Sequence, residues 1–290
     1  MWWILLSSVA FAEGDLAWAW KPENTVSYHI ETLVNTPRSR AWYAEENRFA
    51  RAIKQMMILD VSCKGSAKGK TVSVDCTIDE IEFKGRAVPG EEEDLRAIMT
   101  TDAARLKGKV VRLTTRSDGR IRNVDVQDLP APSGRLGLIN NGLRSMVSRA
   151  FAPFDVQLPK DGVDKGKAWK HKGMPLSMVL MTDQGTSGSV VMKHRVTDTQ
   201  AGFKRLSSSG RGMVSEGSMM EQGTSSMLTI EASGRAQFNT ALGLMDWSEA
   251  SSDTGYAASN VSGFGGPEPG GFSGWIARID DEGKRLEPTD

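Results

Sequence analysis

The segment IKQMMILDVSCKGSAKGKTVSVDCTI, residues 53–78, decides the fold predicted for this chain. Apolar and polar residues alternate on both sides of Gly69-Lys70, with the apolar ones mostly at odd positions before it and at even positions after it. Alternation of this kind is typical of half-buried β-strands, and glycine at the first position of a two-residue turn is typical of a type II′ hairpin. The segment therefore predicts a long antiparallel hairpin with one apolar face.

Cys63 and Cys76 are the only cysteines of the chain, and both fall on the apolar face of this hairpin. A turn at Gly69-Lys70 places them directly opposite each other, so the register predicts a disulfide bond. By the loop-entropy argument, a bond that closes roughly 14 residues stabilises the fold by about 3 kcal/mol in an oxidising compartment. A pair of buried free thiols is the alternative.

The apolar face of the second arm changes phase within the strand. Apolar residues occupy even positions up to Ile78 and odd positions at Ile81 and Phe83. One extra residue at Asp79-Glu80 explains the change, and such an insertion is a β-bulge, which bends a strand and increases its twist. The hairpin is therefore predicted to be curved.

Residues 1–12, MWWILLSSVAFA, form an apolar run that ends in the small-x-small pattern of a signal-peptidase site. They predict a signal peptide cleaved after Ala12 and an exported protein, periplasmic or extracellular. The run lacks the usual Lys or Arg, which leaves open whether Met1 is the true start. No cysteine follows the cleavage site to carry a lipid anchor, and no later segment reaches the ~18 apolar residues of a membrane helix.

Charge and composition argue against two classes of protein. The 36 basic side chains balance the 36 acidic ones, which argues against a nucleic-acid-binding protein and against a polybasic membrane-surface protein. Thirty glycines and short alternating runs favour a β-rich fold. We predict one domain over residues 13–262, followed over residues 263–290 by a Gly/Pro-rich loop, a last strand and a frayed tail.

Two helices are predicted among the strands. The first, residues 91–107, has acidic residues in its first turn, one apolar stripe and Gly108 after its end. The second begins at Ser133 as N-cap and stops before Pro153. A hairpin around Asp118-Gly119 lies between them. Seven strand-like runs follow, at residues 166–171, 176–182, 188–197, 203–209, 213–217, 226–232 and 235–247.

No motif nominates a catalytic residue, a metal ligand or a cofactor. The three histidines, His29, His171 and His194, are not at ligand spacing, and we expect ordinary satisfied or solvated imidazoles at His29 and His194. Residues 65–71, GSAKGKT, look like a phosphate-binding loop, but they have one residue too few between the glycines and lead into a strand instead of a helix. A hydrolase with scattered catalytic residues is a remote alternative.

After the second helix, the chain carries the step Leu158-Pro159, then Val163-x-x-Gly166-x-x-Trp169. Together with the preceding hairpin, in which two strands flank Asp118-Gly119, this motif resembles a group of exported bacterial proteins of unknown function. That group is similar to the periplasmic lipoprotein carriers and the mycobacterial lipoprotein lipid-binders. The resemblance covers residues 105–245 and implies a half-barrel, a curved antiparallel sheet whose concave face is covered by helices and encloses a lipid-binding cavity.

The residues themselves predict the same fold class, mainly β with two helices (α+β), because a curved sheet has one face that amphipathic helices must cover. Fourteen methionines suit a cavity for acyl chains or varied apolar ligands, with ordinary gap filling in the core as the alternative. Inner-face residues of strands and helices are the predicted cavity lining: Met57, Leu59, Val74, Ile78, Ile98, Met99, Leu106, Leu143, Met146 and Val147.

We therefore expect a non-enzymatic envelope protein that binds a lipid or another apolar ligand between sheet and helices. The alternative is a structural or protein-interaction module of the envelope with a solid core, which meets its partner through a sheet edge or through the loop at residues 263–271. A cavity beneath the two helices favours the first function, and a close-packed core favours the second.

Overall fold

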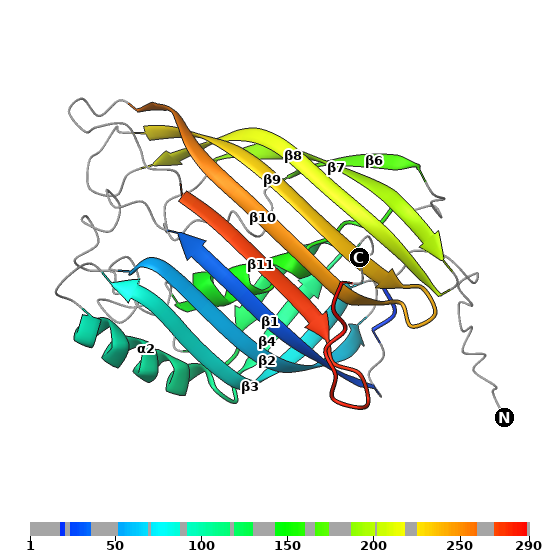
Figure 1. Ribbon diagram of the computed structural model, residues 1–290, viewed down its shortest axis with the longest axis horizontal. Coiled ribbons are helices and arrows are strands. Elements are labelled where there is room, and N and C mark those ends of the chain that lie inside the picture. Colours follow the sequence, from blue (N-terminus) through cyan, green and yellow to red (C-terminus); the bar gives the residue numbers. More distant parts are fainter. Residues whose placement is uncertain are drawn as a thin grey trace.

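The computed structural model describes residues 18–20, 24–35, 52–68, 71–87, 92–116, 119–129, 143–159, 166–173, 187–200, 202–217, 225–259 and 270–288. They form one eleven-stranded antiparallel sheet that is not closed into a barrel, as the α+β prediction requires (Figure 1). The strands are β1 (Thr25–Asn35), β2 (Ala52–Lys68), β3 (Thr71–Ala87), β4 (Val110–Thr115), β5 (Ile121–Val126), β6 (Ala168–Gly173), β7 (Ser187–Gln200), β8 (Phe203–Gly217), β9 (Ser225–Asn239), β10 (Leu244–Ser259) and β11 (Gly270–Arg278).

The sheet consists of two consecutive halves that meet in its middle. Its strand order is β5-β4-β3-β2-β1-β11-β10-β9-β8-β7-β6, so the first and last strands are neighbours. In each half, strands that follow one another in the sequence pair with one another, which requires only antiparallel hairpin connections. The β1–β11 pairing joins the two halves.

The predicted hairpin and its disulfide bond are confirmed. β2 pairs with β3, Cys63 stands opposite Cys76, and the two sulfurs are bonded. Both cysteines are fully buried on the apolar face of the sheet. The turn predicted at Gly69-Lys70 lies outside the described residues.

The predicted bulge is also confirmed. Asp60 pairs with Glu80 and Val61 pairs with Ile78, which leaves Asp79 as the extra residue of β3. The apolar residues of β3 therefore stay on one face on both sides of the bulge. A bulge at this point bends the long hairpin.

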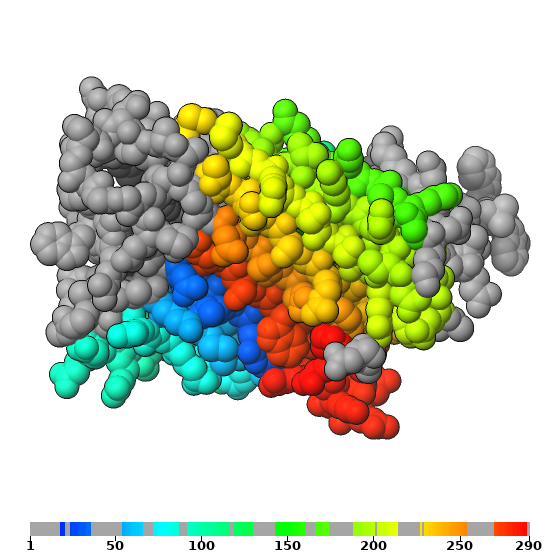
Figure 2. Space-filling model, turned by 45° about the horizontal axis from the view of Figure 1, so that its top comes forward, coloured from blue at the N-terminus to red at the C-terminus, as the bar shows by residue number. Residues whose placement is uncertain are grey.

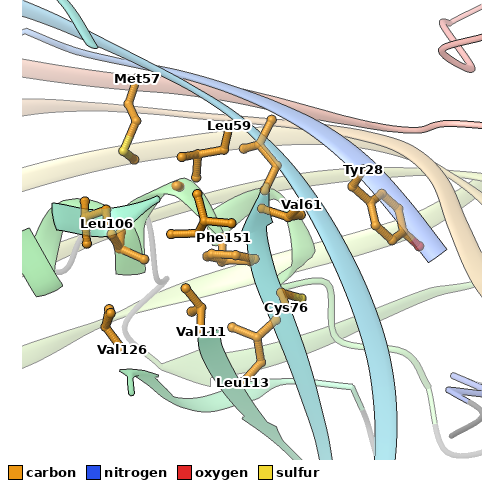
Figure 3. Packing of buried hydrophobic residues seen from close by; sticks show 14 of the residues in the cluster. Tyr28, Met57, Leu59, Val61, Cys76, Leu106, Val111, Leu113, Val126 and Phe151 are labelled. Atoms are coloured by element: carbon orange, nitrogen blue, oxygen red, sulfur yellow. The ribbon is translucent and has the colours of Figure 1, made fainter. Parts of the chain in front are cut away.

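The apolar face, called here the inner face, carries the core of the β1–β5 half. It is covered by the helix at residues 143–150 and by the short helix η2 (Ala152–Phe154). Figure 3 shows Phe151, between these two helices, packed among side chains of β2, β3 and β4. Burial of such side chains stabilises the fold by roughly 25 cal/mol per Å² of apolar surface. The core includes Tyr28, Ile30, Leu59, Val61, Ile78, Val111, Leu113, Leu143, Val147, Phe151 and Phe154.

The first predicted helix is α2 (Glu92–Leu106), and it packs against the end of β3. Leu95 and Met99 contact Phe83, and a side chain at Gly85 would collide with Met99, so the glycine makes room for the helix. Residues 143–150 belong to the second predicted helix, whose predicted start at Ser133 lies outside the described residues. None of the helices that the structure describes is long and apolar enough to cross a membrane.

Two predicted strand breaks in the second half are wrong. Residues 203–209 and 213–217 form the single strand β8, and β9 runs without interruption through Ser233-Gly234. A Cβ atom at Gly234 would lie 2.8 Å from the carbonyl oxygen of Glu249 in β10, so this glycine permits a close approach of two strands instead of a turn. The chain turns at residues 240–243, and β10 continues to Ser259. The run at residues 176–182 lies outside the described residues.

The last strand predicted within residues 263–290 is β11, and it lies in the centre of the sheet, between β1 and β10. Arg278, the last residue of β11, donates a hydrogen bond to Asp246 of β10, with 2.8 Å between Nη2 and Oδ1. The exposed fractions of these two side chains are 16% and 7%, so the ion pair is largely shielded from water.

Reduction of the Cys63–Cys76 bond is expected to destabilise the protein by about 3 kcal/mol, because the bond restricts a loop of roughly 14 residues in the unfolded chain. Thermal unfolding with and without reductant measures the effect. A C63A/C76A double variant is the control, since its midpoint must not respond to reductant. An unchanged midpoint for the reduced wild type would contradict a structural role for the bond.

Replacement of Asp246 by asparagine is expected to cost about 2–4 kcal/mol, because it leaves the largely buried Arg278 guanidinium without its carboxylate. Chemical denaturation measures the free energy of unfolding. Asp253→Asn is the matched control, since Asp253 is exposed on the same strand and its replacement is expected to change stability by less than about 0.5 kcal/mol. Equal effects of the two substitutions would refute a special role for the Asp246–Arg278 pair.

Candidate functional site

The predicted cavity residues lie mostly in one close-packed cluster. Met57, Leu59, Val74, Ile78, Leu106, Leu143, Met146 and Val147 belong to the core beneath the helix at residues 143–150. Met99 packs apart from them with Leu95 against Phe83, and Ile98 is half-buried on α2. None of the ten lines either of the two pockets described below. In the described residues, this half of the inner face is filled by its own side chains.

Over β8–β11 the inner face carries small side chains instead. Hydrogen-bonded neighbours across these strands, all on the inner face, form one row of four small residues and a second row of three. The first row is Ser208, Gly234, Ala250 and Gly274, and the second is Gly210, Ala232 and Ser252. A side chain at Gly210 would collide with the Met192 sulfur, so the thioether of the neighbouring strand lies over this glycine. We call these two rows the inner floor.

A cavity of about 50 Å³ lies between the inner floor and the segment at residues 152–156. Ala152, Pro153, Asp155 and Val156 line one side, and side chains of β6–β10 line the other. A volume of this size holds a water molecule or a small polar group. The cavity is therefore a recess at the margin of the inner floor.

Two of the three histidines meet at this recess. The Nδ1 atom of His194 in β7 lies 2.7 Å from Oγ of Ser208, and its Nε2 atom lies 2.8 Å from Nδ1 of His171 in β6. The indole ring of Trp169 stacks on His194 with 5.4 Å between ring centroids. Burial, and to a smaller extent the charge of His171, lowers the pKa of His194 to about 4. His194 is therefore neutral at pH 7.

An imidazole beside a serine hydroxyl also occurs in serine hydrolases, but this pair does not meet their requirements. With a pKa of about 4, His194 is a weak general base at neutral pH. The adjoining recess of about 50 Å³ is too small for a substrate. Among the residues that the structure describes, no three His, Cys, Asp or Glu side chains come together to hold a metal ion. The cluster is therefore a polar patch in which His194 is neutral at pH 7.

The outer face of the sheet carries a larger and more open site. A groove of about 700 Å³ crosses six strands, from β8 to β2. Its floor is a row of facing residues: Ser233, Ser251 and Ser273, continued by Leu33 and Met56. The hydroxyl oxygens of Ser233 and Ser251 are 2.8 Å apart, within hydrogen-bonding distance. In Figure 2, which views this face, β10, β11 and β1 lie between the yellow-green strands and the cyan ones.

Charged and aromatic residues form one side of this outer groove. Arg235 faces Glu249 and is ion-paired with it, Glu249 faces Trp275, and Trp275 faces Glu31. His29 Nε2 donates a hydrogen bond of 2.9 Å to Glu31. Partial burial alone would raise the pKa of Glu31, but hydrogen bonds from His29 and Trp275 and nearby positive charge lower it below its usual value. Glu31 is therefore ionised at neutral pH.

Sequence reasoning missed the pair His171–His194 because its members are 23 positions apart on neighbouring strands. The expectation of ordinary satisfied imidazoles is confirmed for His29 and His194, since both rings are hydrogen-bonded. The alternation of β7, with Val190, Met192 and Val196 on the inner face, does place His194 on that face. Only the β6–β7 register shows that His171 lies next to it.

Comparisons with known proteins identify no family. No protein family and no curated protein matches the chain. One solved structure with a similar arrangement is that of lipovitellin, described for its lipid–protein interactions, with a TM-score of 0.46 and 8% sequence identity. The match covers 94% of this chain and 26% of lipovitellin, so the chain spans about a quarter of that protein. The resemblance to exported bacterial proteins of unknown function stays a prediction.

Protonation of His194 is expected to make stability fall with pH below about 6.5. The unfolded chain binds a proton there with a pKa of 6.5, whereas the folded protein binds it only near pH 4. Stability at pH 7 is unaffected, and roughly 3 kcal/mol is lost between pH 6.5 and pH 4. Urea unfolding at several pH values measures this slope for the wild type and for His194→Gln. Parallel curves for the two proteins would disprove the assignment to His194.

Proposed function

We propose that this protein is a non-enzymatic binding protein that holds an amphiphilic ligand, such as a lipid, against the inner floor of β8–β11. The observation that carries the proposal is the contrast between the two halves of the inner face. Large apolar side chains of β1–β5 fill the space beneath the helix at residues 143–150, whereas glycine, alanine and serine residues of β8–β11 border a recess of about 50 Å³. Interiors are close-packed, so this recess beside small side chains is where an added group is accommodated most easily.

The groups around the inner floor suit a ligand with both apolar and polar parts. Leu206, Ile230 and Phe272 are buried apolar residues on the same strands. The hydroxyl of Ser252 is buried and has no hydrogen-bond partner in the part of the chain that the structure describes. A buried hydroxyl in this state costs about 1–3 kcal/mol, and a polar group of a ligand would remove the cost.

The proposed ligand position differs from the one expected from the sequence. The expected lining residues, such as Leu59 and Val147, serve as core, and the proposed site lies on the other half of the sheet. Export is part of the proposal, and the Cys63–Cys76 bond supports it because disulfide bonds persist in oxidising compartments. The packed core favours a second candidate, an envelope interaction module without an enclosed ligand.

Native mass spectrometry and lipid extraction test the proposal on protein exported by a bacterial host and purified without denaturation. We expect a co-purified amphiphile, and after its removal we expect saturable binding of a fluorescent fatty acid. Ala232→Leu and Ala250→Leu enlarge side chains of the inner floor and are expected to weaken probe binding by roughly tenfold or more.

Ser209→Leu is the matched control, because Ser209 lies on β8 but on the outer face and outside the outer groove. It adds the same side chain and is expected to leave probe binding unchanged. Absence of both the amphiphile and probe binding in the wild type would reject the lipid proposal in favour of the interaction module.

A further inference from the structure

Most side chains that line the outer groove point away from the inner floor, although the first row of the floor (Ser208, Gly234, Ala250 and Gly274) borders the groove as well. Alternation places Ser251 outward and its neighbours Ala250 and Ser252 inward. The outer groove is also the larger of the two described sites, at about 700 Å³. The second row of the inner floor, which includes Ala232, does not line the groove.

The charged residues that line the outer groove are Arg235, Glu249 and Glu31, and each of them is paired or hydrogen-bonded. Arg235 is ion-paired with Glu249, and Glu31 accepts hydrogen bonds from His29 and Trp275. The next outward row beyond the serines holds another ion pair, Arg211–Glu231, with 3.1 Å between Nε and Oε1. The two carboxylates, Glu31 and Glu249, outnumber the guanidinium of Arg235, so the lining repels a polyanion. The groove therefore disfavours an anionic ligand and accepts an uncharged one.

The lining also suits a ligand with many hydroxyl groups. Serine hydroxyls donate and accept hydrogen bonds, carboxylates accept them and the guanidinium donates them. The lining therefore offers both donors and acceptors to the hydroxyl groups of a ligand. Trp275, Leu33 and Met56 add apolar surface at one end, on which the C–H face of a sugar ring packs. An aliphatic ligand would displace water from the serine hydroxyls and would offer them no hydrogen bond in its place.

The length of the groove favours a chain over a single sugar. From β8 to β2 it crosses five gaps between strands, which amounts to roughly 24 Å at about 4.8 Å per gap. Facing serines on neighbouring strands repeat at this same spacing, which is close to the rise of one hexose unit in an extended glycan. Successive sugar units can thus meet equivalent hydroxyls on successive strands.

We propose that the outer groove binds a linear, neutral oligosaccharide, laid across the strands with its rings over the serine floor and one ring against Trp275. The Trp275 ring lies 5.5 Å from the His29 ring and its indole N–H is hydrogen-bonded to Glu31. Its orientation is therefore set before a ligand arrives, which lowers the entropy cost of binding.

Isothermal titration of the full chain with cellohexaose, xylohexaose, mannohexaose and N-acetylchitohexaose tests this inference. Binding of at least one of them with a Kd below about 1 mM is expected, and Trp275→Ala is expected to weaken it roughly tenfold. Ser251→Val and Ser273→Val remove single exposed hydroxyls in almost the same volume, and each is expected to weaken binding roughly threefold to tenfold without unfolding the protein.

The Ala232→Leu substitution separates this inference from the lipid proposal, because Ala232 belongs to the inner floor and does not line the outer groove. It should weaken fatty-acid binding by roughly tenfold or more and keep oligosaccharide binding unchanged. The inference is overturned if none of the four oligosaccharides binds the wild type, or if the Trp275 and serine variants bind as the wild type does. Tighter binding of a heparin-derived hexasaccharide than of every neutral one would overturn it as well.

Discussion

The pairing of β1 with β11 is the constraint on which the rest of the structure depends. Each half of the sheet forms from consecutive antiparallel strands, but the halves become one sheet only where the first strand meets the last. This register places Thr32 opposite Gly274 on the inner face and Leu33 opposite Ser273 on the outer face. The inner floor therefore ends beside the junction and the outer groove crosses it, so the groove depends on a contact between segments about 240 residues apart in the sequence.

The parts of the fold that sequence reasoning predicted are those that local alternation determines. The β2–β3 hairpin, the Cys63–Cys76 register and the bulge at Asp79 all follow from which positions are apolar within some thirty residues. The central place of β11 could not be predicted, because its partner β1 carries no signal of the pairing. The wrong break at Ser233-Gly234 has another cause: the dipeptide is typical of turns, and only the packing of β9 against β10 shows that the glycine permits close approach.

The candidate site was harder to predict for a related reason. Residues such as Leu59, Met146 and Val147 are apolar and inward-facing, and sequence reasoning cannot distinguish a side chain that lines a cavity from one that fills it. Space is marked by small residues, but glycine, alanine and serine are also common in loops. Ser208 and Gly234 become a floor only when the β8–β9 register places them opposite each other on the inner face. The outer groove depends in the same way on five registers at once.

Where both candidate sites cross β9, β10 and β11, small side chains occupy both faces of the sheet, and this has an energetic consequence. At this crossing the strands bury few large side chains and depend more on backbone hydrogen bonds and on ion pairs such as Arg235–Glu249, whose exposed members contribute at most about 1 kcal/mol. The β1–β5 half has a disulfide bond and a continuous apolar core. Local opening should therefore cost less free energy in the β8–β11 half than in the other. A ligand on either face of that half would replace the missing side-chain contacts, and its binding free energy would add directly to the stability of these strands.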